Sequence, residues 1–299
     1  MSDDLAAILA SIPALAGFRG TPQRLGGLTN RVYRLGDLVL RLPGAGTEAY
    51  INRAHEATAA RLAADAGVSP AVLHADPETG LMVTAFVEAV TMTPDAFRSR
   101  QGAPARAGQL LARLHRSGAA FPFRFELFGM IDSYLALLAP RDVTLPDGYH
   151  DVVAEAGAVR AALSRARVPL TACHCDPLCE NFLDTGSRMW VVDWEYSGMN
   201  DPMWDLGDLS VEAGMDDGQE DAMLTAYFGH EARPGDRGRM VAYKAMCDLL
   251  WTLWGLIQLT DGNPADDFRA YADTRFARCK ALMGTADFAR HLAAIKGEA

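Results

Sequence analysis

The segment from His174 to Asp205 places polar residues in an order that suits phosphoryl transfer. Asp176 is a carboxylate that can orient and deprotonate a hydroxyl, and Asn181 follows it as a neutral oxygen ligand for a hard cation such as Mg²⁺. Asp193 ends the apolar stretch MWVV, whose backbone would hold a second metal-binding group in place. Phosphotransferases need both a base and metal ligands. The segment therefore predicts that Asp176 is the catalytic base and that Asn181 and Asp193 bind the metal.

Each of these residues also has an ordinary structural explanation. Asp176 could be a turn residue, Asn181 a helix cap and Asp193 the end of a strand. We favour the catalytic interpretation because the residues occur in this order and spacing, with a strand between them. Glu195 lies on the same segment and offers a further carboxylate oxygen to the metal environment.

A loop of small residues near the N-terminus is a candidate cover for nucleotide phosphates. The sequence GGLTN precedes RVYRLGDLVLRL, whose alternation around Gly36-Asp37 predicts a β-hairpin within strands over residues 21–42. Backbone N–H groups of such a loop can bind phosphate oxygens. No G-x-x-x-x-G-K-[ST] motif occurs, which excludes a P-loop enzyme. The residues assigned to this role are Gly27, Thr29 and Asn30.

A second nucleotide-binding feature is an arginine–glutamate pair. Arg41 lies in the strand LVLRL, where a kinase would carry its phosphate-binding lysine, and Glu56 lies on the predicted helix 47–66. An arginine can contact a carboxylate through two parallel hydrogen bonds. Taken alone, either residue is more simply a surface charge. Together they predict a pair that orients Arg41 toward phosphates.

The remaining pattern predicts how these residues are positioned. Strands at 72–74 and 81–87 complete a small α+β lobe, and the pattern becomes helical after 93. We expect an N-terminal nucleotide-binding lobe over residues 1–90 and a larger, mainly helical catalytic and substrate-binding lobe over 91–299. The predicted helices of the second lobe cover 105–116, 131–138, 152–165, 219–228, 238–259 and 266–283.

Composition narrows the class of protein. The formal net charge is −10, which argues against nucleic-acid binding and would favour a cationic second substrate. The N-terminal stretch is acidic where a signal peptide is basic, and the apolar stretch 249–259 is too short to span a bilayer. We therefore expect a cytoplasmic protein without membrane insertion. A zinc site at Cys173, Cys175 and Cys179 is disfavoured because the paired C-x₂-C spacing is missing.

Motifs spread from about residue 24 to 276 resemble the choline/ethanolamine kinase family, within the kinase-like group that includes aminoglycoside phosphotransferases. They are GGLTNRVY, VLRL, INR…E, LARLH, HCDPLCENFL, VVDWEYSGMNDPMWDLG and LLWTLWGLIQ. The segment DWEYSGMN discriminates best, since aminoglycoside kinases usually depart from it after the Asp. Cys175 is a departure, because the family usually has Asn between the His and the Asp.

The resemblance implies a two-lobed, protein-kinase-like α+β fold with an antiparallel-sheet N-terminal lobe. It implies ATP and Mg²⁺ as cofactors, with Asp176 as base and Arg41 with Glu56 as the phosphate-binding pair. It assigns the hinge that receives the adenine to Thr84, Phe86 and Val87. It also implies an acceptor pocket that is lined by Glu195, Tyr196, Glu212 and Tyr271.

Two tryptophans point to the kind of acceptor. Trp251 and Trp254 are three positions apart and share a helix face. Indole faces could wall a pocket for a quaternary ammonium, which is bound by cation–π attraction and a nearby carboxylate. The alternative is that both are core residues. With the site motif, we expect a cage for a small cationic alcohol, choline above all.

Other acceptors and another class of protein stay open. Ethanolamine is the nearest rival, because a primary ammonium prefers hydrogen-bond acceptors to aromatic faces. Thiamine and aminoglycosides are further acceptors for the same chemistry. A non-catalytic, kinase-shaped binding protein is the alternative class, and the presence of Asp176, Asn181 and Asp193 together argues against it. The sequence leaves the oligomeric state open.

Overall fold

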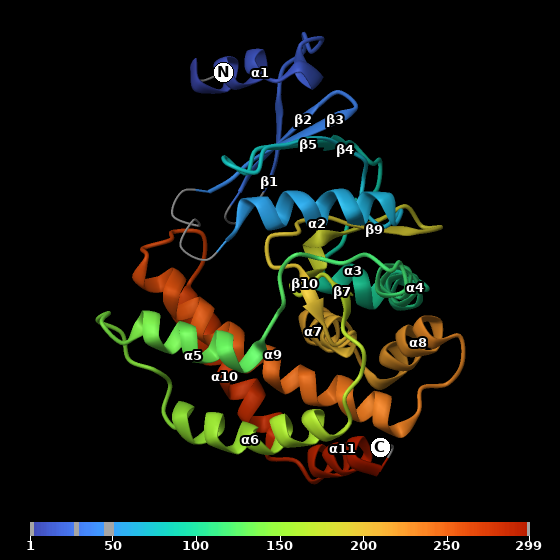
Figure 1. The fold of residues 1–299 in the computed structure, drawn as a ribbon, viewed down its shortest axis with the longest axis vertical. Helices are drawn as coiled ribbons and strands as arrows, with labels where there is room; N and C mark the ends of the chain where they lie inside the picture. Colours follow the sequence, from blue (N-terminus) through green and yellow to red (C-terminus); the bar gives the residue numbers. More distant parts are fainter. Residues whose placement is uncertain (1–2, 27–29, 45–50, 298–299) are drawn as a thin grey trace.

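The smaller lobe is an antiparallel sheet with a helix on each side. The computed structural model describes residues 3–26, 30–44 and 51–297. The strand order is β1-β2-β3-β5-β4, and α1 lies on the outer side of the sheet while α2 lies between it and the larger lobe (Figure 1). The elements are α1 (Asp3–Ser11), β1 (Gln23–Gly26), β2 (Arg31–Leu35), β3 (Leu38–Leu42), α2 (Arg53–Asp65), β4 (Val72–Ala75) and β5 (Met82–Ala85).

The alternation of β3 decides where Arg41 points. Leu40 and Leu42 are buried in a small core beneath α1, together with Leu5 and Val83. Because successive side chains of a strand face opposite sides, Arg41 faces α2 and the larger lobe. The β2–β3 hairpin turns at Gly36, whose φ of 66° requires the left-handed region that glycine enters without strain. The predicted hairpin is confirmed.

The larger lobe surrounds its site segment with helices. Two short sheets, β7 with β10 and β6 with β8 and β9, hold the residues before and after Asp176. The strands are β6 (Val90–Thr91), β7 (Thr171–Cys173), β8 (Phe182–Asp184), β9 (Met189–Val191) and β10 (Gly198–Asn200). The helices are α3 (Pro94–Ser99), α4 (Ala103–His115), α5 (Leu127–Leu138), α6 (Tyr149–Arg165), α7 (Met203–Ala213), α8 (Asp217–Phe228), α9 (Pro234–Thr260), α10 (Phe268–Met283) and α11 (Ala286–Gly297).

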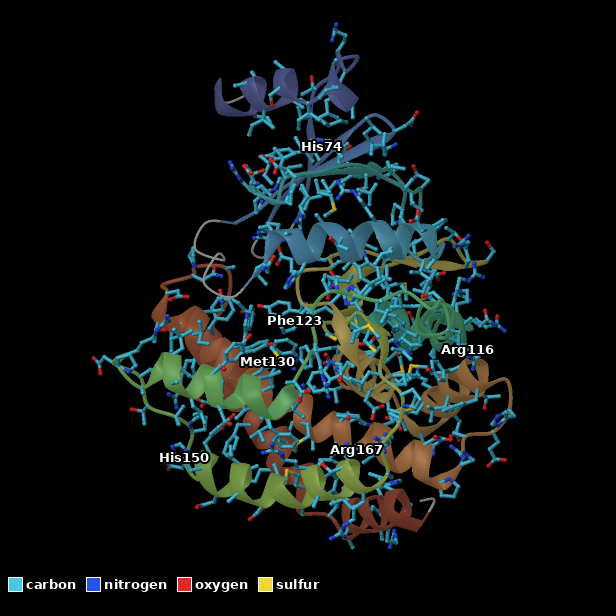
Figure 2. All side chains as sticks on the ribbon, viewed as in Figure 1. His74, Arg116, Phe123, Met130, His150 and Arg167 are labelled. Carbon is cyan, nitrogen blue, oxygen red and sulfur yellow. The ribbon has the colours of Figure 1, made fainter. Side chains whose placement is uncertain are left out.

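The long helix α9 is the centre of this lobe. It packs against α5, α7, α10 and α11, and side chains fill the space between the helices (Figure 2). In length and composition α9 could cross a membrane, but 89% of its apolar window is buried inside the fold, as in a core helix. At the crossing of α7 with α9, a Cβ on Gly207 would lie 2.7 Å from the Met240 carbonyl oxygen, so the glycine allows the two backbones to approach.

The predicted α+β, two-lobed architecture is confirmed, and most predicted helices and strands occur within a few residues of their expected bounds. The helix that was expected from residue 47 begins at Arg53, and residues 45–50 lie outside the described part. Asn52 caps it by accepting hydrogen bonds from the N–H groups of Ala54 and His55. The sequence did not predict α7 or α11, and α7 proves important for the site.

Candidate active site

The loop that carries Asp176 is anchored on α7 by one carboxylate. Asp205 is fully buried and accepts hydrogen bonds from the backbone N–H groups of His174, at 2.7 Å, and Cys175, at 2.8 Å. His115 Nε2 lies 2.9 Å from the same carboxylate, and Tyr227 contacts the other ring nitrogen at 3.0 Å. Hydrogen bonds to a charged acceptor are stronger than neutral ones, so Asp205 fixes the backbone next to Asp176.

The backbone conformation of Cys175 explains why Asn is usual at this position in the family that the sequence resembles. Its φ is 67°, in the left-handed region where Asn is several-fold enriched. The buried Sγ lies 3.8 Å from the Cys173 carbonyl oxygen and 4.0 Å from that of Gly198, while Asn200 Nδ2 approaches it at 3.8 Å. Cysteine thus keeps the loop conformation while it makes only weak sulfur contacts in place of an amide's hydrogen bonds.

Asp176 lies where negative charge accumulates. Burial raises the pKa of its carboxyl well above the usual range, and the charges of Asp193 and Glu212 raise it further, whereas Arg275 opposes them. Asn181 Nδ2 donates to the Asp176 carbonyl oxygen at 3.0 Å, a contact that does not use the Asn181 amide oxygen. The structure therefore brings the predicted base and one predicted metal ligand together.

Asp193 belongs to a cluster of carboxylates beneath the smaller lobe. Carboxylate oxygens of Glu56, Asp193 and Glu195 all lie within 4.8 Å of one another. Burial, followed by the charge of Glu195, raises the pKa of Asp193 to about 7. Asp193 has a φ of 71°, a rare value for a residue with a side chain that often marks functional sites. Asn181 and this cluster carry oxygen atoms of the kind that Mg²⁺ prefers as ligands.

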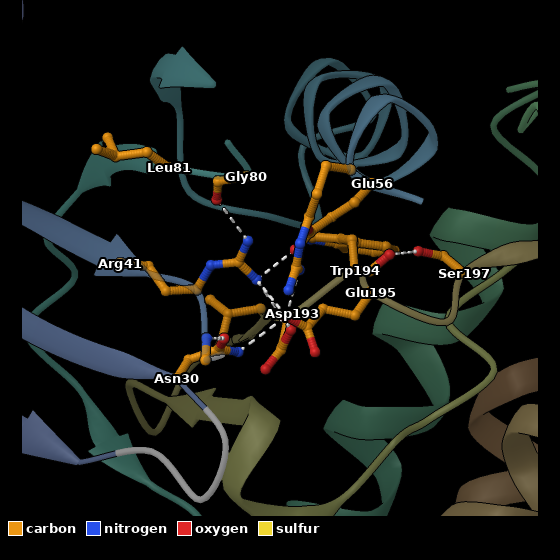
Figure 3. A network of polar contacts seen from close by, with 12 residues as sticks. Asn30, Arg41, Glu56, Gly80, Leu81, Asp193, Trp194, Glu195 and Ser197 are labelled. Atoms are coloured by element: carbon orange, nitrogen blue, oxygen red, sulfur yellow. Dashed lines mark hydrogen bonds and ion pairs between the residues drawn. The ribbon is translucent and has the colours of Figure 1, made fainter. Parts of the chain in front are cut away.

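Two arginines of the smaller lobe contact this cluster, and Figure 3 shows the first, Arg41, among its partners. Arg41 forms an ion pair with Glu56, lies 3.3 Å from both Asp193 and Glu195, and donates to the Gly80 carbonyl oxygen at 3.1 Å. The predicted Arg41–Glu56 pair is thus present. Arg53 contacts Glu56 at 2.9 Å and Glu195 at 2.7 Å.

Arg53 was not predicted as a site residue, although its position three residues before Glu56 on one helix face was a usable signal. Glu195 was expected both near the metal and among the acceptor residues. Its carboxylate contacts Arg41, Arg53 and Asn30, all from the smaller lobe, and lies in the cluster with Asp193.

The other predicted nucleotide residues are only partly described. Gly27 and Thr29 lie outside the described residues. Asn30 is buried and joins Glu195 to the Gly44 backbone, with distances of 3.0 and 3.2 Å. The predicted hinge residues are half-buried where the chain leaves β5, and the Phe86 N–H donates to the Asp37 carbonyl oxygen at 2.8 Å. The residues of this hinge are Thr84, Phe86 and Val87.

Four predicted aromatic residues form two pairs on the acceptor side. Tyr196 and Trp251 meet edge to face with ring centroids 5.3 Å apart, and Trp254 and Tyr271 do so at 5.6 Å. A Cβ on Gly255 would lie 2.6 Å from the Tyr271 ring, so this glycine makes room for it. Trp251 is only 3% exposed and therefore deeper than a simple cage wall, whereas the other three rings are half-buried.

Glu212 differs from the expected free counter-charge. Arg275 Nη2 lies 2.5 Å from its carboxylate, and the same guanidinium reaches Asp248 at 3.3 Å and stacks over Tyr271, 4.5 Å from the ring centroid. Arg278 also binds Asp248, with an Nε–Oδ2 distance of 2.6 Å. Arg275 and Asp248 were not predicted, and no motif spacing marked them.

The disfavoured zinc site finds no support in the positions of its residues. Cys173, Cys175 and Cys179 are buried as free thiols, and burial raises the pKa of each. His174, the suggested fourth ligand, directs Nε2 at the Val192 carbonyl oxygen, 2.9 Å away. These residues support the loop and the adjoining strand.

Comparisons with known proteins agree with this geometry. Residues 21–243 match the phosphotransferase enzyme family. A crystal structure of a choline/ethanolamine kinase family protein from Mesorhizobium loti is 66% identical, covers 99% of each chain and has a TM-score of 0.92. The choline kinase LicA from Streptococcus pneumoniae is 26% identical, with a TM-score of 0.80 over 95% of this chain and 100% of that chain.

The comparisons also include an ethanolamine kinase. Mouse ethanolamine kinase 2 is 27% identical over 268 residues, which are 80% of this chain and 68% of the mouse protein. Relatives that act on either amino alcohol thus match most of the chain. The protein is a phosphotransferase with an alcohol acceptor, and it belongs to the choline/ethanolamine kinase family within the phosphotransferase enzyme family.

Proposed function

We propose that the protein is a cytoplasmic, Mg²⁺- and ATP-dependent kinase that phosphorylates the hydroxyl of choline. The observation that carries this proposal is the arrangement of Asp176, Asn181 and Asp193. Asn181 Nδ2 donates to the Asp176 carbonyl oxygen at 3.0 Å, and the N–H of Val192, the residue before Asp193, donates to the Asn181 carbonyl oxygen at 3.0 Å. The proposed base thus lies beside the proposed metal ligands, as phosphoryl transfer requires.

Residues 1–90 would bind the nucleotide in this proposal. Glu56 holds the Arg41 guanidinium, and Gly80 orients its second amino group, so Arg41 would meet the phosphates as a pre-oriented cation. The hinge beyond β5 would receive the adenine. A pair that is already oriented needs little rearrangement when the nucleotide binds.

Asn181 and Asp193 would hold Mg²⁺, which when bound would neutralise charge on the transferring phosphoryl group. The residues fit such an ion, because an amide oxygen and a carboxylate of raised pKa, beside further carboxylates, form a hard-oxygen donor set. Asp176 would accept a hydrogen bond from the acceptor hydroxyl and take its proton late in the transfer. Its raised pKa makes it a better proton acceptor than an ordinary aspartate.

Residues 91–299 would bind the acceptor. Tyr196, Trp251, Trp254 and Tyr271 supply ring surfaces that suit a trimethylammonium group. Polycationic aminoglycosides would need several uncommitted acidic groups, but Glu212 and Asp248 are already paired with arginines. Ethanolamine is the second candidate, because relatives of both specificities match this chain.

The test is an ADP-release screen with Mg-ATP over choline, ethanolamine, thiamine and aminoglycosides. We expect the highest kcat/KM with choline. A higher kcat/KM with another alcohol would identify that alcohol as the acceptor instead. If the protein binds Mg-ATP in a thermal-shift titration but turns over none of these alcohols, a non-catalytic binding protein is favoured.

A pair of tryptophan variants tests the aromatic pocket. Trp254→Leu should raise the choline KM by about tenfold through lost cation–π attraction and leave the ATP KM unchanged. Trp190→Leu is the matched control, because that indole stacks under Arg188 at 3.7 Å instead. Equal effects of the two substitutions would contradict the pocket.

A further inference from the structure

Asp208 stands out among the acids near the acceptor side because no arginine or lysine forms an ion pair with it in the described part of the chain. Glu212 is paired with Arg275, and Asp248 is paired with Arg275 and Arg278. In the proposed function, Asp176 accepts the hydrogen bond and the proton of the acceptor hydroxyl. Asp208 is 1% exposed, so bulk solvent does not screen its charge either.

The Asp208 carboxylate is only half satisfied by hydrogen bonds. Its Oδ2 accepts from the Trp251 indole N–H at 3.3 Å. Its Oδ1 is buried and has no hydrogen-bond partner within residues 3–26, 30–44 and 51–297. A buried acceptor without a partner is costly and rare, and such a group is a candidate for a functional role.

The position of Asp208 follows from two local features. It lies on the same face of α7 as Asp205, which anchors the catalytic loop, and Glu212, which holds Arg275. Trp251 on α9 reaches this face, because its indole N–H donates to Asp208 at 3.3 Å. Asp208 is therefore placed at the N–H edge of a ring of the proposed acceptor pocket.

We propose that Asp208 is the counter-ion for the cationic nitrogen of the acceptor, acting from the N–H edge of Trp251. The inference rests on the proposed function and deepens it, since it moves the counter-charge from Glu212 to Asp208. A carboxylate that accepts a hydrogen bond from the indole N–H adds negative potential at the ring face, which strengthens its attraction for a cation. In a dry interior this charge is weakly screened.

The raised pKa of Asp208 agrees with a carboxylate that needs a nearby positive charge to ionise. Burial raises the pKa of its carboxyl well above the usual range, with the charges of Glu212 and Asp176 adding to the rise and Arg275 opposing it. A bound cationic acceptor would supply the missing positive charge. The role is one of specificity, because a neutral alcohol of the same shape gains nothing from Asp208.

The experiment compares choline with its neutral carbon isostere, in which a tert-butyl group replaces the trimethylammonium. Asp208→Asn keeps an oxygen for the Trp251 N–H and removes the charge. We expect kcat/KM for choline to fall by about tenfold or more, with the values for the isostere and the KM for ATP unchanged. Equal losses for both alcohols would assign a packing role, and an unchanged choline value would also overturn the proposal.

Two further arms keep the test independent of folding and of the proposed function. Trp251→Phe keeps a ring but removes the N–H that joins it to Asp208, and it should also reduce the preference for choline over the isostere. Calorimetric titration with tetramethylammonium measures cation binding without turnover. If the wild-type protein phosphorylates no amino alcohol, the proposed function fails, while weaker tetramethylammonium binding by Asp208→Asn would still support the counter-ion and unchanged binding would refute it.

Discussion

Substitution of Asp205 by Asn tests whether one carboxylate on α7 holds the catalytic loop. The carboxylate receives the N–H groups of His174 and Cys175 at 2.7 and 2.8 Å, and His115 Nε2 lies 2.9 Å from it. An asparagine of the same shape has a single oxygen, and its NH₂ group cannot accept a hydrogen bond. At least one buried backbone N–H is then left facing another donor.

The magnitude follows from these contacts. Each hydrogen bond to a charged group contributes about 1.5–3 kcal/mol, so the loss of at least one, with a buried N–H left unpaired, should cost about 3 kcal/mol. For a chain of this size that loss lowers Tm by about 5 °C. Because Cys175 holds a strained φ of 67° next to Asp176, the loop should relax, and a displacement of about 1 Å can lower kcat by about a hundredfold.

The assay combines thermal unfolding with steady-state kinetics at saturating acceptor and Mg-ATP. Asp201→Asn is the matched control, because Asp201 is equally buried on the same segment but contacts Arg239 at 2.6 Å and Tyr243 at 3.1 Å, not the loop. We expect both variants to lose stability and only Asp205→Asn to lose kcat. Equal kcat values for the two variants would refute the anchoring role.

Three other substitutions test separate parts of the structure. Arg41→Lys keeps the charge but cannot contact Glu56 and the Gly80 carbonyl together, so kcat/KM for ATP should fall by about tenfold with the acceptor KM unchanged; a wild-type value would contradict the pairing. Burial alone would raise the pKa of Asp184, but hydrogen bonds from Arg106 and its neighbours outweigh it and lower that pKa. Asp184 therefore stabilises the fold above its unfolded pKa of about 4, and this stability is lost as pH falls through the lower folded pKa. Asp184→Asn should cost about 3 kcal/mol at neutral pH and flatten the acid limb of a urea-unfolding pH profile, and an unchanged limb would contradict this. Cys175→Asn should raise the unfolding free energy by about 1 kcal/mol, since Asn tolerates the left-handed region and can donate to nearby carbonyls; a lower stability would show that the pocket fits only the thiol.

Short-range patterns carried most of the fold and the chemical core of the site. The β2–β3 hairpin was readable from its turn and alternation, and the proposed base and metal ligands were identified from one continuous segment. The Arg41–Glu56 pair joins a strand to the next helix. The order of strand and helix expected for a kinase was therefore enough to predict it. These features depend on residues that are close in sequence or fixed by one motif.

Long-range pairing could not be read in the same way. Glu212 looked like a free counter-charge because its partner, Arg275, lies three helices later along the chain, on α10. Asp205 and Asp208 act through a helix, α7, that the sequence did not predict, and their partners come from a loop and from α9. Which acid keeps its charge depends on which arginine reaches it, and that is decided by tertiary packing.

The most direct test of the central claim is the formation of phosphocholine by the wild-type protein and by Asp176→Asn, followed by phosphorus NMR with Mg-ATP and choline. We expect phosphocholine with the wild-type protein and none above background with Asp176→Asn, while both bind Mg-ATP with similar affinity in a thermal-shift titration. Equal phosphocholine formation by the two proteins would contradict the assignment of Asp176 as the base, and the absence of product from the wild-type protein would contradict choline as the acceptor.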